Sequence, residues 1–360
     1  MIAYIFLLTT ALFFSRYVPT KEECGYSTTW VWLVLILTLF QGLRNSTVGT
    51  DTPSYCREFL NAIGGWRTMT LNFDWATFTE EPGFAIINQV AAFISTTNYV
   101  SLLLVVAFTS AICAIISIRE NSVCVAASLY AFISLAFYLF GFAAMRQSVA
   151  LCVFMLSLKY LYRKKFFKYC VVILVAALFH KSVIITLPFY FITKLNFGIK
   201  SVAMMGVSGM IVGYIMPKLV AFGATLEERY ELYQEGNATG GETLMLFAIC
   251  LAIFFMFVRR YISINRIHVY DINLYFVIVS ALIYLVVNMT GSYVELNRFA
   301  MYFQMPSIFL YADYYRVVYK EKKSDKFIFG GLTIVFLAYY LVYVSTIGGI
   351  GKYMLNQTLF

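Results

Sequence analysis

Long apolar runs follow one another along this chain, separated by short polar stretches. Many reach about 20 residues, the length that an α-helix needs to cross the ~30 Å hydrocarbon core of a bilayer. Spans are predicted near residues 2–17, 28–43, 98–118, 122–141, 145–162, 199–217, 243–260, 270–289, 299–318 and 326–347. The pattern therefore predicts an all-α, polytopic transmembrane protein with about ten full spans, folded as a single integral-membrane domain over residues 1–360.

One segment, residues 166–193, breaks this pattern at His180-Lys181-Ser182. About a dozen apolar residues lie on each side of the break, and each half is too short to cross a membrane alone. We therefore expect a half-helix pair, that is, two half-length helices that enter and leave by the same face and meet at a polar apex.

The positions of Lys and Arg predict the orientation, because cytoplasmic loops retain these residues. The strongest clusters are Arg163-Lys164-Lys165, Arg259-Arg260 and the lysines of 320–326. If all three are cytoplasmic, the segments 44–97 and 218–242 are extracytoplasmic.

The first of these outer segments is expected to contain two short helices. Thr52-Pro53 and Glu81-Pro82 both combine an N-cap residue with a proline at the first helical position.

Composition agrees with a membrane protein and excludes several other classes. Hydrophobic residues make up 61% of the chain and charged residues 12%, which is too apolar for a soluble domain. The net charge of +9 follows from the inner clusters, so it predicts topology and gives no reason to expect nucleic-acid binding. The seven cysteines show no C-x-x-C spacing, and neither a metal nor another cofactor is expected.

Three basic residues stand at the ends of apolar runs, namely Arg146, His180 and Arg298. A charge at bilayer depth costs roughly 2.5–3.5 kcal/mol, so such residues usually face a polar cavity and serve a ligand. Each also has a structural explanation. Arg146 can bond helix-start carbonyls, His180 can be a buried structural histidine, and Arg298 can pair with Glu295.

Two further residues, which follow the second span, can each be explained by a ligand or by the fold. Arg44 is either a ligand-binding cation or an interfacial arginine that reaches toward the headgroups. Asp51 is either a site residue or a cap for the turn before Pro53.

The predicted topology brings five basic side chains to the outer face: Arg44, Arg146, His180, Lys181 and Arg298. The planar guanidinium of arginine binds phosphate oxygens bidentately. Several such donors in a low-dielectric cleft match a diphosphate better than a neutral substrate. The sequence therefore predicts an outward-facing site for a diphosphate ester.

A series of short motifs in a fixed order resembles the EpsG family, whose members are similar to Wzy-type O-antigen and exopolysaccharide polymerases. The motifs are G-x-R-x-x-x-V-G-T-D-T-x-x-Y from Gly42, E-P-G-F from Glu81, R-Q at Arg146, F-H-K-S from Phe179 and N-R-x-x-x-Y-F from Asn297. The resemblance implies transfer of a growing glycan from undecaprenyl diphosphate to a lipid-linked repeat unit at the outer face of the cytoplasmic (inner) membrane.

This resemblance also implies roles for individual residues. Arg146 and Arg298 would bind the diphosphate with Arg44 as a third donor, His180 would be the general base, and Asp51 or Glu81 would orient its imidazole or the acceptor sugar. The other expected substrate-binding residues are Gln147, Lys181, Asn297 and Tyr302. Catalysis is expected to be metal-independent.

The expected partners are the lipid-linked oligosaccharide and membrane lipid, with a flippase and a chain-length regulator acting alongside. Three other functions fit the sequence. A flippase or exporter would also bind a diphosphate but should contain repeated halves. A membrane O-acyltransferase would open His180 inward, and a non-catalytic scaffold would tolerate loss of single arginines.

Overall fold

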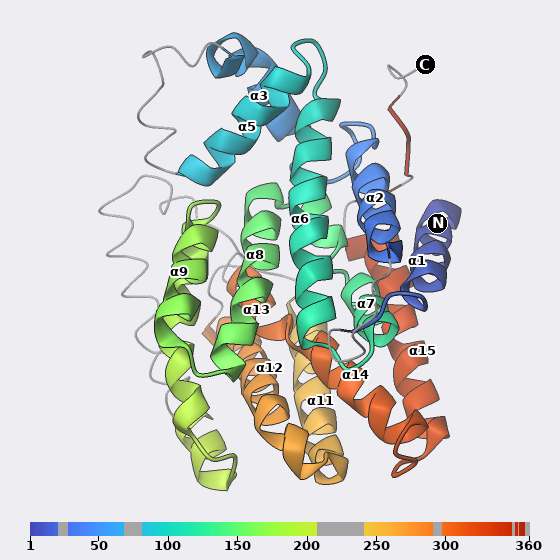
Figure 1. The fold of residues 1–360 in the computed structure, drawn as a ribbon, viewed down its shortest axis with the longest axis vertical. Helices are drawn as coiled ribbons and strands as arrows, with labels where there is room; N and C mark the ends of the chain where they lie inside the picture. Colours follow the sequence, from blue (N-terminus) through green and yellow to red (C-terminus); the bar gives the residue numbers. More distant parts are fainter. Residues whose placement is uncertain are drawn as a thin grey trace. The chain divides into compact units, whose positions relative to one another are not determined.

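The computed structural model describes residues 1–20, 28–67, 81–206, 241–290, 297–347, 350–351 and 353–356, which are mostly helical (Figure 1). Within these ranges, the only extended pairing is an isolated antiparallel bridge between Arg44 and Leu355. The all-α prediction is therefore confirmed for this part of the chain.

The chain divides into two compact units. The first is formed by Met1–Leu187 together with Tyr311–Phe360, and the second by Pro188–Leu310. The expectation of a single integral-membrane domain stays a prediction.

The first unit is built around one long helix, α6 (Val100–Asn121). This helix packs along α2 (Thr29–Gly42) and α8 (Met145–Tyr162), and α8 in turn packs along α9 (Phe166–Ala177) (Figure 1). Small residues buried on α6 allow close helix packing, and Ser117 donates a hydrogen bond of 2.7 Å across to the carbonyl of Met155 on α8. Further described helices of this unit include α1 (Ile2–Ser15), α7 (Val125–Ser134), η2 (Leu139–Phe142), α15 (Lys326–Val342) and η7 (Tyr343–Ile347).

The two short helices expected between residues 44 and 97 are present as α3 (Thr52–Arg67) and α5 (Pro82–Ile94). Glu81 is the N-cap of α5 with proline at the next position, as predicted. At α3 the cap lies one residue earlier than expected. The carbonyl of Asp51 accepts the first helical bonds, and the hydroxyl of Thr52 makes a long-range contact with the carbonyl of Phe142.

The expected number of spans is not supported. Among the described residues, four helices are long and apolar enough to cross a membrane: Val100–Asn121, Glu242–Tyr261, Ile264–Met289 and Lys326–Thr346. The shorter apolar helices run over Ile2–Ser15, Thr29–Gly42, Pro82–Ile94, Val125–Ser134 and Phe166–Ala177. Of the predicted segments, 207–217 and 218–240 lie outside the described residues.

Two predicted spans are broken for local reasons. The run 122–141 ends its α-helix at Ser134, and Ala136 takes a positive φ of 63° before the chain continues as η2. The run 299–318 is divided at Pro306 into α13 (Asn297–Gln304) and α14 (Ser307–Tyr319). Proline lacks the N–H that a continuous helix requires and clashes with the preceding turn.

The break predicted at His180-Lys181 is confirmed. The helix α9 ends at Ala177, and a 3₁₀-helix, η3 (Lys181–Lys194), follows the turn. The hydroxyl of Tyr169 on α9 donates a hydrogen bond of 2.6 Å to the carbonyl of Thr186 on η3, so the chain doubles back at this turn.

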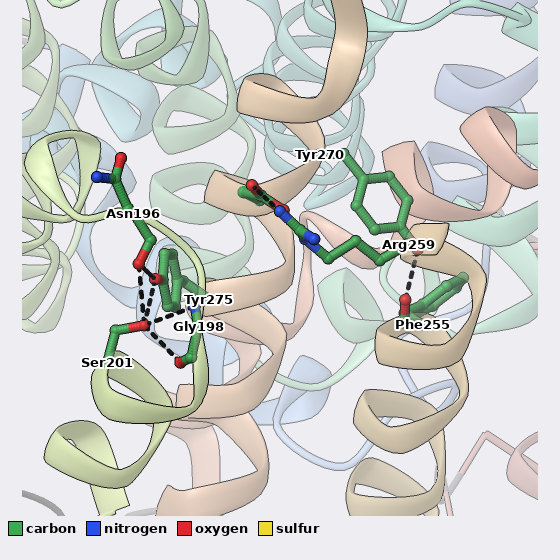
Figure 2. Close-up of polar contacts among 8 residues, drawn as sticks. Asn196, Gly198, Ser201, Phe255, Arg259, Tyr270 and Tyr275 are labelled. Carbon is green, nitrogen blue, oxygen red and sulfur yellow. Dashed lines mark hydrogen bonds and ion pairs between the residues drawn. The ribbon is translucent and has the colours of Figure 1, made fainter. Parts of the chain in front are cut away.

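In the second unit, α11 (Glu242–Val258) and α12 (Ile264–Thr290) form a hairpin through η5 (Arg259–Tyr261). Figure 2 shows the contacts near its turn. Arg259 pairs with both carboxylate oxygens of Asp271 at 2.5 and 2.9 Å, and Tyr270 donates a hydrogen bond of 2.8 Å to the carbonyl of Phe255. The hydroxyl of Tyr275 lies 2.7 Å from that of Ser201, which fixes the segment after η3 against α12. The predicted spans 243–260 and 270–289 match these two helices.

Candidate functional site

A single carboxylate joins two of the basic residues singled out by the sequence. Glu81 Oε2 accepts a hydrogen bond from Arg146 Nη1 at 2.9 Å. Glu81 Oε1 lies 2.7 Å from Nδ1 of His180. Glu81 caps α5, Arg146 begins α8, and His180 lies in the turn between α9 and η3. Residues up to 99 positions apart in the sequence thus form one cluster.

Close packing of α5 against that turn holds the cluster together. The amide of Gly83 donates a hydrogen bond of 2.8 Å to the carbonyl of Leu178. A Cβ atom at Gly83 would lie 3.0 Å from this same carbonyl group, which is tighter than ordinary van der Waals contact. The glycine of the E-P-G-F motif therefore lets Glu81 reach His180.

Arg146 is surrounded by aromatic and acidic side chains. Its Cζ lies 5.3 Å from the ring centre of Tyr55 and 5.1 Å from that of Phe84, distances typical of cation–π interactions. Its Nη2 lies 3.6 Å from Oε2 of Glu58, a second and more exposed carboxylate. With 29% of its side chain exposed, Arg146 is fixed in place and still accessible to a ligand.

The contacts of Glu81 set its charge. Burial alone would raise the pKa of Glu81, but the hydrogen bond with His180 and the charge of Arg146 outweigh burial, so the pKa lies below its ordinary value of 4.5. Glu81 is therefore ionised near neutral pH and can only accept hydrogen bonds. Nδ1 of a neutral His180 must then carry the proton, which leaves Nε2 as an acceptor.

Arg44 has a different environment from the one expected. It is only 1% exposed, and four of its N–H groups donate hydrogen bonds within the protein. The acceptors are the carbonyls of Gln41, Val48 and Gly141 and the hydroxyl of Thr52. A substrate-binding role for Arg44 is therefore not supported, because four of its five N–H donors already bond within the protein. Burial lowers the pKa of Arg44 to about 10, so the side chain stays charged at neutral pH.

Arg44 instead joins three parts of the fold. Thr52, which begins α3, also donates a hydrogen bond of 2.8 Å to the carbonyl of Phe142, just before α8. Gly49 packs against the same carbonyl of Phe142, and a Cβ atom at this position would lie only 1.8 Å from the carbonyl oxygen. Its φ of 109° is also a backbone conformation that favours glycine. The V-G-T-D-T segment is therefore a close-packed joint between α2, α3 and the start of α8.

The remaining expected residues of the first unit are near the cluster in sequence. Gln147 follows Arg146 and is buried, Lys181 follows His180 and is exposed, and Asp51 caps α3 through its carbonyl. Of the two carboxylates proposed to orient His180, the structure places Glu81 in contact with it.

The other three expected residues lie on α13, in the second unit. Asn297 begins this helix, Arg298 is exposed, and Tyr302 is fully buried, which fits packing better than contact with a substrate. The expected meeting of Arg298 with Arg146 stays a prediction.

The sequence did not predict that Tyr55, Phe84 and Glu58 surround Arg146. A signal for each was present. Tyr55 ends the T-D-T-x-x-Y motif, and Phe84 ends E-P-G-F. Glu58 lies three residues after Tyr55, so the two share one face of α3.

The described fold and cluster define a helical membrane protein in which a carboxylate contacts both an imidazole and an arginine. A family model described as the EpsG family matches residues 27–357, and the chain belongs to this family. Membership gives it a polymerase-like role in making exopolysaccharide or O-antigen. No curated protein and no solved structure matches the chain.

Proposed function

We propose that this protein polymerises lipid-linked oligosaccharides into O-antigen, capsule or exopolysaccharide chains. A growing glycan on undecaprenyl diphosphate would be transferred to a lipid-linked repeat unit, and free undecaprenyl diphosphate would leave. Membership of the EpsG family supports the reaction class. The contact of Glu81 with both His180 and Arg146 is the observation that supports a mechanism.

His180 is the proposed general base. Glu81 holds Nδ1–H of the imidazole, so Nε2 can take the proton of the acceptor sugar's hydroxyl. The acceptor oxygen then forms a bond to the anomeric carbon of the growing glycan. The bond from that carbon to the diphosphate oxygen breaks, and its electron pair leaves with the diphosphate.

Arg146 is proposed to stabilise the charge that develops on the leaving diphosphate. Cations already aimed at the position where negative charge appears lower the barrier without reorganising. Glu81 and Glu58 carry two negative charges against the single charge of Arg146. A diphosphate therefore needs further cations, and Arg298 and Lys181 are proposed to supply them. With charge and base supplied by side chains, we propose that no metal is required.

The site is proposed to open at the outer face of the cytoplasmic membrane. The turn at 163–165 and the α11–α12 turn carry basic clusters, which favours a cytoplasmic position for both. Reporters that are active only in the cytoplasm should be active when fused after Lys165 or Arg260 and inactive after Thr97. Activity after Thr97, with none after Lys165, would reverse the proposed orientation.

A His180→Asn variant tests the proposed base. The asparagine amide can still donate a hydrogen bond to Glu81 but offers no basic nitrogen at the position of Nε2. In proteoliposomes supplied with a lipid-linked repeat unit, we expect polymerisation to fall about 10²–10⁴-fold. Binding of undecaprenyl diphosphate should be nearly unchanged.

The chain contains a matched control for this experiment. His268, the second of its two histidines, lies near the start of α12, and His268→Asn should polymerise at the normal rate. Normal polymerisation by His180→Asn would exclude His180 as the base. Failure of the unmodified protein to extend any lipid-linked repeat unit would exclude the proposed reaction.

A further inference from the structure

We propose that residues 353–356 act as a latch. By pairing with the backbone on both sides of Arg44, they hold the close-packed joint that Arg44 forms with the V-G-T-D-T segment, and this positions Tyr55 and Glu58 around Arg146. This inference rests on the proposed function only for its effect on activity. Its structural part is independent of any reaction.

The latch pairs with the chain on both sides of Arg44. The amide of Asn45 donates a hydrogen bond of 2.8 Å to the carbonyl of Met354, and the amide of Asn356 donates one of 2.9 Å to the carbonyl of Leu43. These two bonds form the antiparallel bridge between Arg44 and Leu355. A segment distant in the sequence thus fixes the backbone from which the buried arginine extends.

An aromatic anchor strengthens this pairing. The ring of Tyr353 stacks on that of Phe40 with centroids 4.4 Å apart and an interplanar angle of 20°. Its hydroxyl donates a hydrogen bond of 2.7 Å to the carbonyl of Phe40, and its edge meets the ring of Tyr4 at 5.8 Å. By contrast, the side chains of Met354 and Leu355 are 46% and 49% exposed. These two residues can therefore be changed without removing the contacts of Tyr353.

The joint transmits this constraint to the candidate site. Arg44 binds the hydroxyl of Thr52 at the start of α3 and the carbonyl of Gly141 shortly before α8. Tyr55 and Glu58 lie one and two turns along α3, and both contact Arg146 on the first turn of α8. Loosening Arg44 would therefore change how α3 and α8 present these side chains to each other. The residues of the latch act by positioning and touch no reacting group.

Cys56 reports on the joint without requiring activity. It lies on α3, is 3% exposed, and is close enough to Arg44 for the charge of the arginine to act on the pKa of the thiol. Burial raises the pKa of the Cys56 thiol to about 12, so it should react slowly with maleimide in the intact protein. Exposure would return the pKa toward 9 and speed the reaction.

The test uses full-length protein in which Cys56 is the only cysteine left of the seven. The disrupted variant carries Tyr353→Ala and Asn356→Pro, which remove the stacked ring and the amide that bonds Leu43. The matched control carries Met354→Ala and Leu355→Ala, which change the two exposed neighbours. We expect maleimide to label Cys56 at least ~10-fold faster in the disrupted variant only, since labelling follows thiolate exposure. Equal labelling in both variants would overturn the latch.

A second measurement separates positioning from general loss of stability. If the latch acts through Tyr55, the latch substitutions should reduce polymerisation little further in a protein that already carries Tyr55→Ala. Substitutions that act through the same contact do not have additive effects on free energy. If the combined variant instead loses activity by the product of the two separate fold-losses, the latch does not act through Tyr55. That result would overturn the positioning role even if Cys56 is labelled faster. If no variant and no unmodified protein polymerises, the labelling result still decides whether the latch exists.

Discussion

Arg146→Ala is expected to reduce polymerisation about 10²–10³-fold, the usual cost of removing one preorganised donor from a site of developing negative charge. Cells that carry the variant should display single repeat units in place of long chains. The same substitution leaves Glu81 and Glu58 without their shared cation. The amount of protein in the membrane must therefore be measured beside the chain-length profile.

Arg146→Lys keeps the charge and makes the prediction independent of folding. A lysine ammonium cannot contact Glu81 and a phosphate with the two-pronged geometry of a guanidinium. We expect at least a ~10-fold loss with normal protein levels.

Arg57→Ala is the matched control, since Arg57 is an exposed cation on α3 and its loss should leave chain length unchanged. Long chains in both Arg146 variants would exclude the role assigned to this residue.

The sequence predicted the helices well wherever local pattern decides the structure. The apolar run at 243–260 became α11 (Glu242–Val258), and proline after Glu81 marked the start of α5. The pattern failed on span length, because mean hydropathy does not show where a helix ends within an apolar run. Ala136, with its positive φ, follows the end of α7 inside the run 122–141, and Pro306 divides the run 299–318.

The candidate site was predictable in part for a related reason. A motif can mark Arg146, Glu81 and His180 as important without showing which of them meet. The role of Arg44 could not be read from the sequence, because one of its acceptors, the carbonyl of Gly141, lies 97 residues away. Whether an arginine serves a ligand or the fold depends on such acceptors, and backbone carbonyls have no sequence signature.

The latch, too, could not be predicted from the sequence. Residues 353–356 lie outside every predicted span and every motif that marked the site. Their pairing with Leu43 and Asn45 uses backbone groups, so only the folded chain reveals it.

Glu81→Gln should be as damaging as the loss of Arg146, for a different reason. Glutamine keeps the size of the side chain and can accept a hydrogen bond, but it has no charge to favour the imidazolium that forms when His180 takes a proton. It also removes the charge that fixes Arg146. We expect polymerisation to fall about 10²–10⁴-fold, the range for impaired general base catalysis.

A comparable ion pair elsewhere in the first unit provides the control for this variant. Glu120 pairs with Lys159 at 2.8 Å, and the two side chains are 23% and 21% exposed. Glu120→Gln removes a carboxylate of the same kind, so it should leave the polymerisation rate unchanged. A similar loss in both variants would attribute the effect of Glu81→Gln to general destabilisation.

The pH dependence of stability provides a separate test of the electrostatic role of Glu81. Its pKa in the folded protein lies below the ordinary value of 4.5. The ionised form therefore contributes stability that is fully present above the unfolded-state pKa and is lost as the pH falls through the folded-state pKa. The melting temperature of the natural protein should exceed that of Glu81→Gln near neutral pH. This difference should shrink below pH 4.5, whereas a difference that stays constant into the acid range would show that His180 and Arg146 do not stabilise the charge of Glu81.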